Sequence, residues 1–107
     1  MKFETVNNYK LFCGLNDKDK YIQIIETENA IEIIKSIVCS KVGGATFNMN
    51  EGFWVDENNN PTTETTISIL ISGTNDDMIF EICQELKVAL NQNCIMVEKT
   101  ESKIAFI

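Results

Sequence analysis

Acidic and amide side chains gather in two stretches of the sequence, and these residue types are suited to chemistry. The first stretch is Asn-Asp-Lys-Asp at positions 16–19, and the second is residues 56–64, with the sequence DENNNPTTE. Carboxylate and amide oxygens bind hard cations such as Ca²⁺, and paired carboxylates can transfer protons. The ligand candidates are therefore Asp17, Asp19, Asp56, Glu57 and Glu64.

The spacing of these acids does not match a known cation-binding loop. Residues 56–64 lack the D-x-[DN]-x-[DN]-G-x₅-E pattern and its turning glycine. Alternating charges in a short connector are typical of a solvated surface. We therefore interpret 56–64 as the soluble tip of a hairpin and 16–19 as a charged connector. No residue is assigned as catalytic, cofactor-binding or metal-ligating.

The composition argues against several classes of function. The chain has 16 acids and 9 bases, all of them Lys, for a net charge of −7, and it has neither His nor Arg. Without His it cannot form a Ser-His or Cys-His nucleophile pair, and without Arg it lacks the bidentate group that reads phosphate or guanine. We expect no nucleic-acid partner and no cofactor, and the composition favours a protein that is not an enzyme.

The four cysteines and the N-terminus indicate the cellular location of the protein. Cys13, Cys39, Cys83 and Cys94 show no C-x-x-C spacing, so we expect four reduced thiols, with Cys39 facing away from the apolar stripe of its helix. The N-terminus has no apolar signal region, and no apolar run is long enough to span a membrane. A cytoplasmic location without a membrane partner is the expectation.

Hydrophobic periodicity predicts six main elements in a single domain over residues 1–107. Alternation predicts strands over 9–15, 45–55, 65–72 and 94–97, with a bulge at Gly52. Helical spacing predicts one helix that Thr27 caps and Gly43-Gly44 ends, and another that Thr74 or Asn75 caps and residues 91–93 end. Residues 21–25 are ambiguous, 98–103 are polar, and 104–107 form a short apolar segment.

The order strand, helix, strand, strand, helix, strand predicts a fold class. It is the βαββαβ pattern of the ferredoxin-like α+β sandwich. Two right-handed crossovers place both helices on one face of a four-stranded antiparallel sheet.

Two short motifs carry a resemblance that covers roughly residues 9–98. They are Gly-Leu-Asn-Asp-Lys-Asp at 14–19 and Gly-Gly-Ala-Thr at 43–46, followed by a hairpin with an acidic tip. The chain resembles a family of small ferredoxin-like proteins from low-GC bacteria and their phages or mobile elements. The resemblance implies a compact fold and a mobile-element context, and it supplies no activity and no catalytic residue.

One face of the predicted sheet has the composition of an interface. If Ile67, Ile69 and Ile71 face the helices, the period of two sends Phe12, Leu70 and Met96 to the opposite face. Trp54 joins them if the bulge at Gly52 keeps the alternation in phase. An apolar centre with a polar rim predicts a homo-oligomer, with a dimer as the first expectation, or a protein partner. The alternative is that the chain termini cover this patch.

Three functions remain open at this point. The leading interpretation is a non-enzymatic protein-binding or self-associating module in a phage or mobile-element context. The alternative is a small-molecule sensor or an enzyme with a pocket between the helices and the sheet. A further alternative is an acidic mimic of nucleic acid that engages a basic protein.

Overall fold

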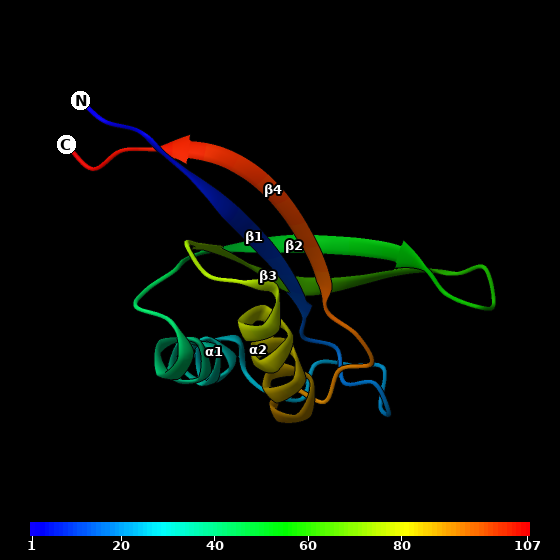
Figure 1. The fold of residues 1–107 in the computed structure, drawn as a ribbon. Coiled ribbons are helices and arrows are strands. Elements are labelled where there is room, and N and C mark those ends of the chain that lie inside the picture. The colour runs from blue at the N-terminus through cyan, green and yellow to red at the C-terminus, as the bar shows by residue number, and fades with distance from the viewer.

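A computed structural model describes all residues from 1 to 107 and has the predicted order of elements (Figure 1). The elements are β1 (Glu4–Gly14), α1 (Thr27–Lys41), β2 (Thr46–Val55), β3 (Pro61–Ser72), α2 (Asp76–Ala89) and β4 (Met96–Ile104). The strands form one antiparallel sheet in the order β2-β3-β1-β4. The predicted α+β fold with βαββαβ order is confirmed.

Both helices lie on the same face of the sheet, and the other face is left open (Figure 1). The β2–β3 hairpin reaches beyond the helices, and the two termini lie side by side at the far end of β1 and β4 (Figure 1). Neither helix has the length and the apolar content needed to cross a bilayer.

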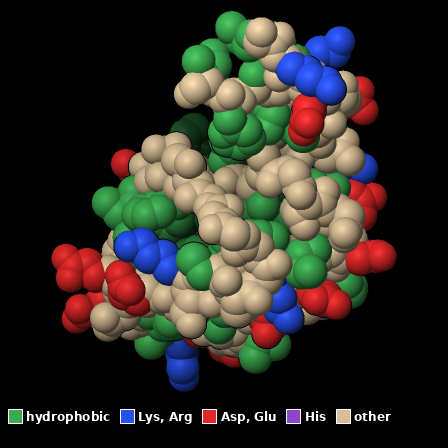
Figure 2. Space-filling view, turned by 60° about the vertical axis from the view of Figure 1, so that its left-hand side comes forward, with side chains coloured by type: hydrophobic (Ala, Val, Ile, Leu, Met, Phe, Trp, Pro, Cys, Tyr) green, Lys and Arg blue, Asp and Glu red, His purple; other side chains and the backbone are tan.

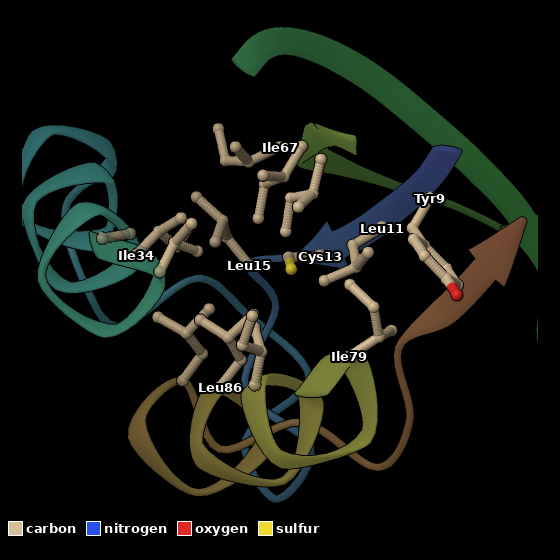
Figure 3. Close-up of a cluster of buried hydrophobic side chains, with 14 residues drawn as sticks. Tyr9, Leu11, Cys13, Leu15, Ile34, Ile67, Ile79 and Leu86 are labelled. Atoms are coloured by element: carbon tan, nitrogen blue, oxygen red, sulfur yellow. The ribbon is translucent and has the colours of Figure 1, made fainter. Parts of the chain in front are cut away.

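The core lies between the sheet and the helices, as the alternation of apolar residues predicts. Tyr9, Leu11 and Cys13 on β1 are at most 2% exposed, and they pair with Ile71, Ile69 and Ile67 on β3. Figure 3 shows this buried cluster. Each helix contributes its apolar stripe to the same cluster: Ala30, Ile34 and Val38 from α1, and Ile79, Ile82 and Leu86 from α2. Burial of these side chains is the main source of stability.

Three strands are longer than the sequence-based prediction. β1 begins at Glu4, β3 begins at Pro61, and β4 runs as one strand from Met96 to Ile104. The added residues are mostly polar and exposed, so they show no alternation of hydrophobicity. Backbone pairing extends them, because Glu4 to Phe12 are in register with Ile104 to Met96.

The predicted bulge at Gly52 is wrong. The register of β2 with β3 runs without interruption from Thr46 opposite Leu70 to Val55 opposite Pro61. Gly52 therefore keeps the alternation in phase, and Trp54 stays on the open face.

The helix ends follow the prediction only in part. Asn75 caps α2, since its side chain accepts a hydrogen bond of 2.9 Å from the Met78 amide. Thr27 is not a cap, because α1 starts at Thr27 and Glu26 holds the cap position without a side-chain hydrogen bond. α1 ends at Lys41, and the extended residue Val42 already leaves the helix before Gly43.

The four cysteines are free thiols in very different surroundings. Cys13 is fully buried, and burial raises the pKa of its thiol to about 12. Cys39 is exposed, as predicted, and Cys83 is half-buried. Cys94 lies exposed in the connection before β4, so its predicted place in a strand is wrong.

Thiol alkylation of the native protein should therefore be selective. Iodoacetamide at pH 8 should modify Cys39 and Cys94 quickly, Cys83 slowly and Cys13 not at all, because the thiolate is the reactive form and burial suppresses it. Mass spectrometry of digested protein measures each site, and the same reaction in urea should label all four. Rapid labelling of Cys13 in the native protein would contradict this core.

Candidate functional site

The five acidic candidates do not form one site. The Asp56 carboxylate closes the hairpin turn, accepting hydrogen bonds from the amides of Asn58 at 2.9 Å and Asn60 at 2.8 Å. Glu57 is exposed beside it. Asp17 and Asp19 lie in the segment after β1, where both accept hydrogen bonds from Asn91 at the end of α2. No three acidic or cysteine side chains are grouped so that they could hold a metal ion.

Glu64 is the one candidate whose carboxylate is held in place on the sheet. It lies on β3, half-buried on the open face, and its Oε2 accepts a hydrogen bond of 3.0 Å from the backbone amide of Asn16. The side-chain amide of Asn16 donates to the carbonyl of Thr63 at 3.2 Å. The segment after β1 is therefore tied to the strand that carries Glu64.

Two glycines make room for the polar side chains of this region. A methyl group added at Gly14 would lie 2.4 Å from Glu64 Oε1, so the carboxylate rests directly on the backbone of β1. On the other side, a methyl group at Gly52 would lie 2.6 Å from the hydroxyl of Thr66. Glycine inside a strand often marks a place where another group approaches the backbone closely. The side chains of Glu64 and Thr66 therefore lie against backbone at Gly14 and Gly52, where no side chain intervenes.

The Glu64 carboxylate has no cationic partner. The four ion pairs of the protein involve Lys35, Lys41 and Lys99, and none of them includes Glu64. Acidic side chains are spread widely over the face seen in Figure 2, with hydrophobic side chains exposed between them. With a net charge of −7, the protein offers a negative surface to any small cation.

A second candidate is a groove of about 430 Å³ between α2 and β4. Its walls include Ile79, Phe80 and Ile95, and its polar end holds Asp76 between Tyr9 and Lys99. Asp76 Oδ1 accepts a hydrogen bond of 2.6 Å from the Tyr9 hydroxyl, and it lies 2.9 Å from Lys99 Nζ.

The polar groups at the end of this groove, Tyr9, Asp76 and Lys99, are paired with one another. The Tyr9 hydroxyl and the Lys99 ammonium lower the pKa of Asp76, and the hydrogen bond to Asp76 raises the pKa of both Tyr9 and Lys99. The Asp76 carboxylate is ionised and already paired. It closes the edge between α2 and β4 and has no free charge for a cation.

The four residues predicted for an interface lie on the open face. Phe12 pairs with Ser68 on one side and Met96 on the other, and Leu70 pairs with Lys10 and Thr46. Trp54, Leu70 and Met96 are 45%, 44% and 61% exposed. The terminal residues Phe106 and Ile107 are fully exposed, so they do not cover this patch. The role of the four residues in an interface remains a prediction.

Sequence reasoning grouped Glu64 with the hairpin tip and missed its true neighbours. Gly14 and Asn16 meet Glu64 only because β1 and β3 pair in a register that places Gly14 opposite Thr66. The glycine at the end of the first strand was the available signal, since a side chain there would collide with the carboxylate.

Comparisons with known proteins give similarity at the level of structure. No family model and no curated protein matches the chain. A phage SAM lyase in complex with S-methyl-5'-thioadenosine is similar with a TM-score of 0.69 and 19% identity, covering 94% of this chain and 90% of that one. A phage SAM lyase in the apo state gives a TM-score of 0.65 and 21% identity, covering 94% and 89%. At this identity the likeness shows the shared fold.

The structural neighbours bear on two predictions. The leading interpretation, a non-enzymatic protein-binding or self-associating module, is contradicted, because two phage SAM lyases share this fold over nearly the whole chain, and the enzyme alternative agrees better. The predicted phage context agrees with two phage neighbours, whereas nothing among the comparisons supports an origin in low-GC bacteria.

Replacing Gly14 by Ala should move Glu64 and leave the fold intact. The added methyl group overlaps the end of a flexible side chain, which can rotate away, whereas the backbone of a strand accepts Ala readily. We expect the Asn16 amide resonance to shift upfield as it loses its carboxylate acceptor, with a change in the free energy of unfolding below about 1 kcal/mol. Gly43→Ala is the matched control, because it meets no atom within 4 Å. An unshifted Asn16 amide in the Gly14→Ala protein would contradict the placement of Glu64.

Proposed function

We propose that this protein cleaves S-adenosylmethionine and releases S-methyl-5'-thioadenosine, using the open sheet face around Glu64. The observation that carries the proposal is the similarity in fold, over 94% of the chain, to a phage SAM lyase that holds S-methyl-5'-thioadenosine. A phage or mobile-element origin is part of the same proposal.

The chemistry of this substrate answers the argument that a chain without histidine is poorly suited to catalysis. The sulfur of S-adenosylmethionine is a sulfonium, so it leaves as a neutral thioether that keeps the electron pair of the broken S–C bond. Such a leaving group needs no proton from a general acid. A chain without His, Arg or a metal cluster is therefore compatible with this reaction, although it is poorly suited to most hydrolytic chemistry.

Glu64 is the carboxylate best placed to meet this substrate. It is half-buried, fixed by the Asn16 amide and free of any cation, so its charge is available to the sulfonium or the ammonium of the ligand. Trp54 lies one position further along the same face, opposite Thr62. Aromatic rings stack on nucleobases and attract cations, which are both parts of this substrate.

The groove between α2 and β4 is less suited to the same ligand. The Asp76 carboxylate is paired with the Lys99 ammonium and accepts a hydrogen bond from the Tyr9 hydroxyl, and Lys87 adds a second ammonium to the walls. A sulfonium placed there would meet two positive charges and one carboxylate that is already paired. Electrostatics therefore favour the open face.

The reaction breaks one bond without adding water, as the word lyase implies. The bond that breaks joins sulfur to the amino-acid fragment. The carbon that loses sulfur then either bonds to an oxygen of the fragment's own carboxylate or forms a double bond to the neighbouring carbon, which loses a proton. Glu64 serves both routes: it holds the ammonium in the first and accepts the proton in the second. In both routes the positive sulfonium and a negative carboxylate lose their charges as the bond breaks. A site that excludes water therefore accelerates the step.

Replacing Glu64 by Gln should abolish most of the activity while it preserves shape. We expect kcat/KM for release of S-methyl-5'-thioadenosine to fall at least about 100-fold, because the amide cannot supply the negative charge or accept a proton. Chromatography of the reaction mixture measures this product. Glu57→Gln makes the same change of charge at the exposed hairpin tip and should stay near the wild-type rate. A wild-type protein that leaves S-adenosylmethionine intact would refute the proposal.

Homo-oligomerisation through the open face would complete such a site. On a single chain Glu64 is half-buried, and Trp54, Leu70 and Met96 are partly exposed on the same face of the sheet. A second copy packed on this face would bury these side chains and exclude water from the carboxylate. We propose this assembly on the composition of the face.

Light scattering tests the assembly directly. The wild type should have a mass above that of the 12.1 kDa monomer, and the double variant Leu70→Lys with Trp54→Ser should be monomeric because a buried, unpaired ammonium is costly. Phe80→Lys, on the helix side and 64% exposed, is the matched control and should leave the mass unchanged. A monomeric wild type, or a double variant with unchanged mass, would exclude the open face as the contact.

A further inference from the structure

The segment that presents Asn16 to Glu64 is held from behind by the end of α2. Gln92 lies just beyond this helix, and its side-chain Nε2 donates a hydrogen bond of 2.7 Å to the carbonyl of Asn16. The two residues are 76 positions apart in the sequence. The contact therefore links the helical layer to the candidate site on the opposite face of the sheet.

Asn91 strengthens the same link with three hydrogen bonds. Its side-chain amide donates to Asp17 Oδ1 at 2.8 Å and to Asp19 Oδ2 at 2.9 Å, and its carbonyl accepts from the amide of Lys18 at 3.0 Å. The hydrogen bond from Asn91 lowers the pKa of Asp17, which keeps that acceptor ionised. Asn91 has a φ of 49°, in the left-handed region that Asn tolerates better than most residues. These contacts fix the direction in which the chain leaves α2, and hence the position of Gln92.

We infer that Gln92 is a positioning residue for Glu64. The chain of contacts runs from Gln92 Nε2 to the Asn16 carbonyl, and from the Asn16 amide to Glu64 Oε2 at 3.0 Å. The carbonyl and the amide of Asn16 belong to different peptide groups, so the effect is one of position and not of polarisation. This inference rests on the proposed function for its kinetic consequence, while its structural consequence can be measured separately.

Loss of the Gln92 hydrogen bond should release Glu64. Without a donor from Gln92, the half-buried Asn16 carbonyl has to find another partner, and the segment turns toward water. The Asn16 amide then leaves the Glu64 carboxylate, which is free to rotate off Gly14. A reacting group displaced by about 1 Å can lose on the order of 100-fold in rate.

The pair of substitutions Gln92→Glu and Gln92→Lys separates position from charge. Glu has the shape of Gln but no N–H group to donate, whereas Lys keeps a donor that can reach the same carbonyl. We expect Gln92→Glu to lower kcat for release of S-methyl-5'-thioadenosine between about 10-fold and 100-fold, and Gln92→Lys to stay close to the wild type. Local charge alone predicts the reverse order, because an added acid attracts the cationic substrate and an added base repels it. Gln84→Glu and Gln84→Lys repeat both charge changes at an exposed position of α2.

A readout without substrate makes the outcome unambiguous. The Asn16 amide resonance and its hydrogen exchange should change in Gln92→Glu and remain near wild type in Gln92→Lys, with both variants melting as cooperatively as the wild type. An unmoved Asn16 amide in Gln92→Glu, or equal loss of kcat in both Gln92 variants, would overturn the inference. If the wild type does not cleave S-adenosylmethionine, the proposed function fails, and the Asn16 amide alone decides whether Gln92 positions this segment.

Discussion

The pairing of β1 with both β3 and β4 is the constraint on which the rest of the structure depends. β1 is the only strand with β3 on one side and β4 on the other, and its residues Tyr9, Leu11 and Cys13 fill the centre of the core. The period of two then fixes what the other side of the same strand presents, namely Lys10, Phe12 and Gly14. One strand thus sets the packing of both helices and the floor of the candidate site. A shift of its register by one residue would exchange the two faces and destroy both.

Much of the fold could be predicted because the strongest signals in the sequence are periodic. Alternation at Ile67, Ile69 and Ile71 and the helical stripes were enough for the order of elements and for the core. The polar ends of β1 and β4 could not be found in this way, since their pairing relies on backbone hydrogen bonds that leave no hydrophobic pattern. Gly52 was misread as a bulge because a glycine that clears space for Thr66 and one that bends a strand look alike in sequence.

The candidate site was harder to predict than the fold for a related reason. Glu64 was identified as an acid in a polar stretch, but its meaning comes from Asn16, which is 48 positions away, and from the missing side chain of Gly14. No local spacing encodes these contacts, and they appear only when the register of β1 with β3 is known. The acids that looked equivalent to Glu64 in the sequence, such as Asp56, are used up in local turn hydrogen bonds.

The sequence-based argument against an enzyme treated proton transfer as a general requirement of catalysis. A chain without His lacks the usual proton carrier near neutral pH, and that matters when a leaving group must be protonated. In the proposed reaction a sulfonium departs as a neutral thioether, so the protein would have to hold a cation, orient its fragments and exclude water. The Glu64 carboxylate, which has no cationic partner, would serve the first of these on the proposed function. The hydrogen bonds from the end of α2 to the segment after β1 would serve the second by holding Glu64 in place. The third is the demand that an exposed sheet face cannot meet alone, and it gives the apolar residues of that face a reason to be covered by another molecule.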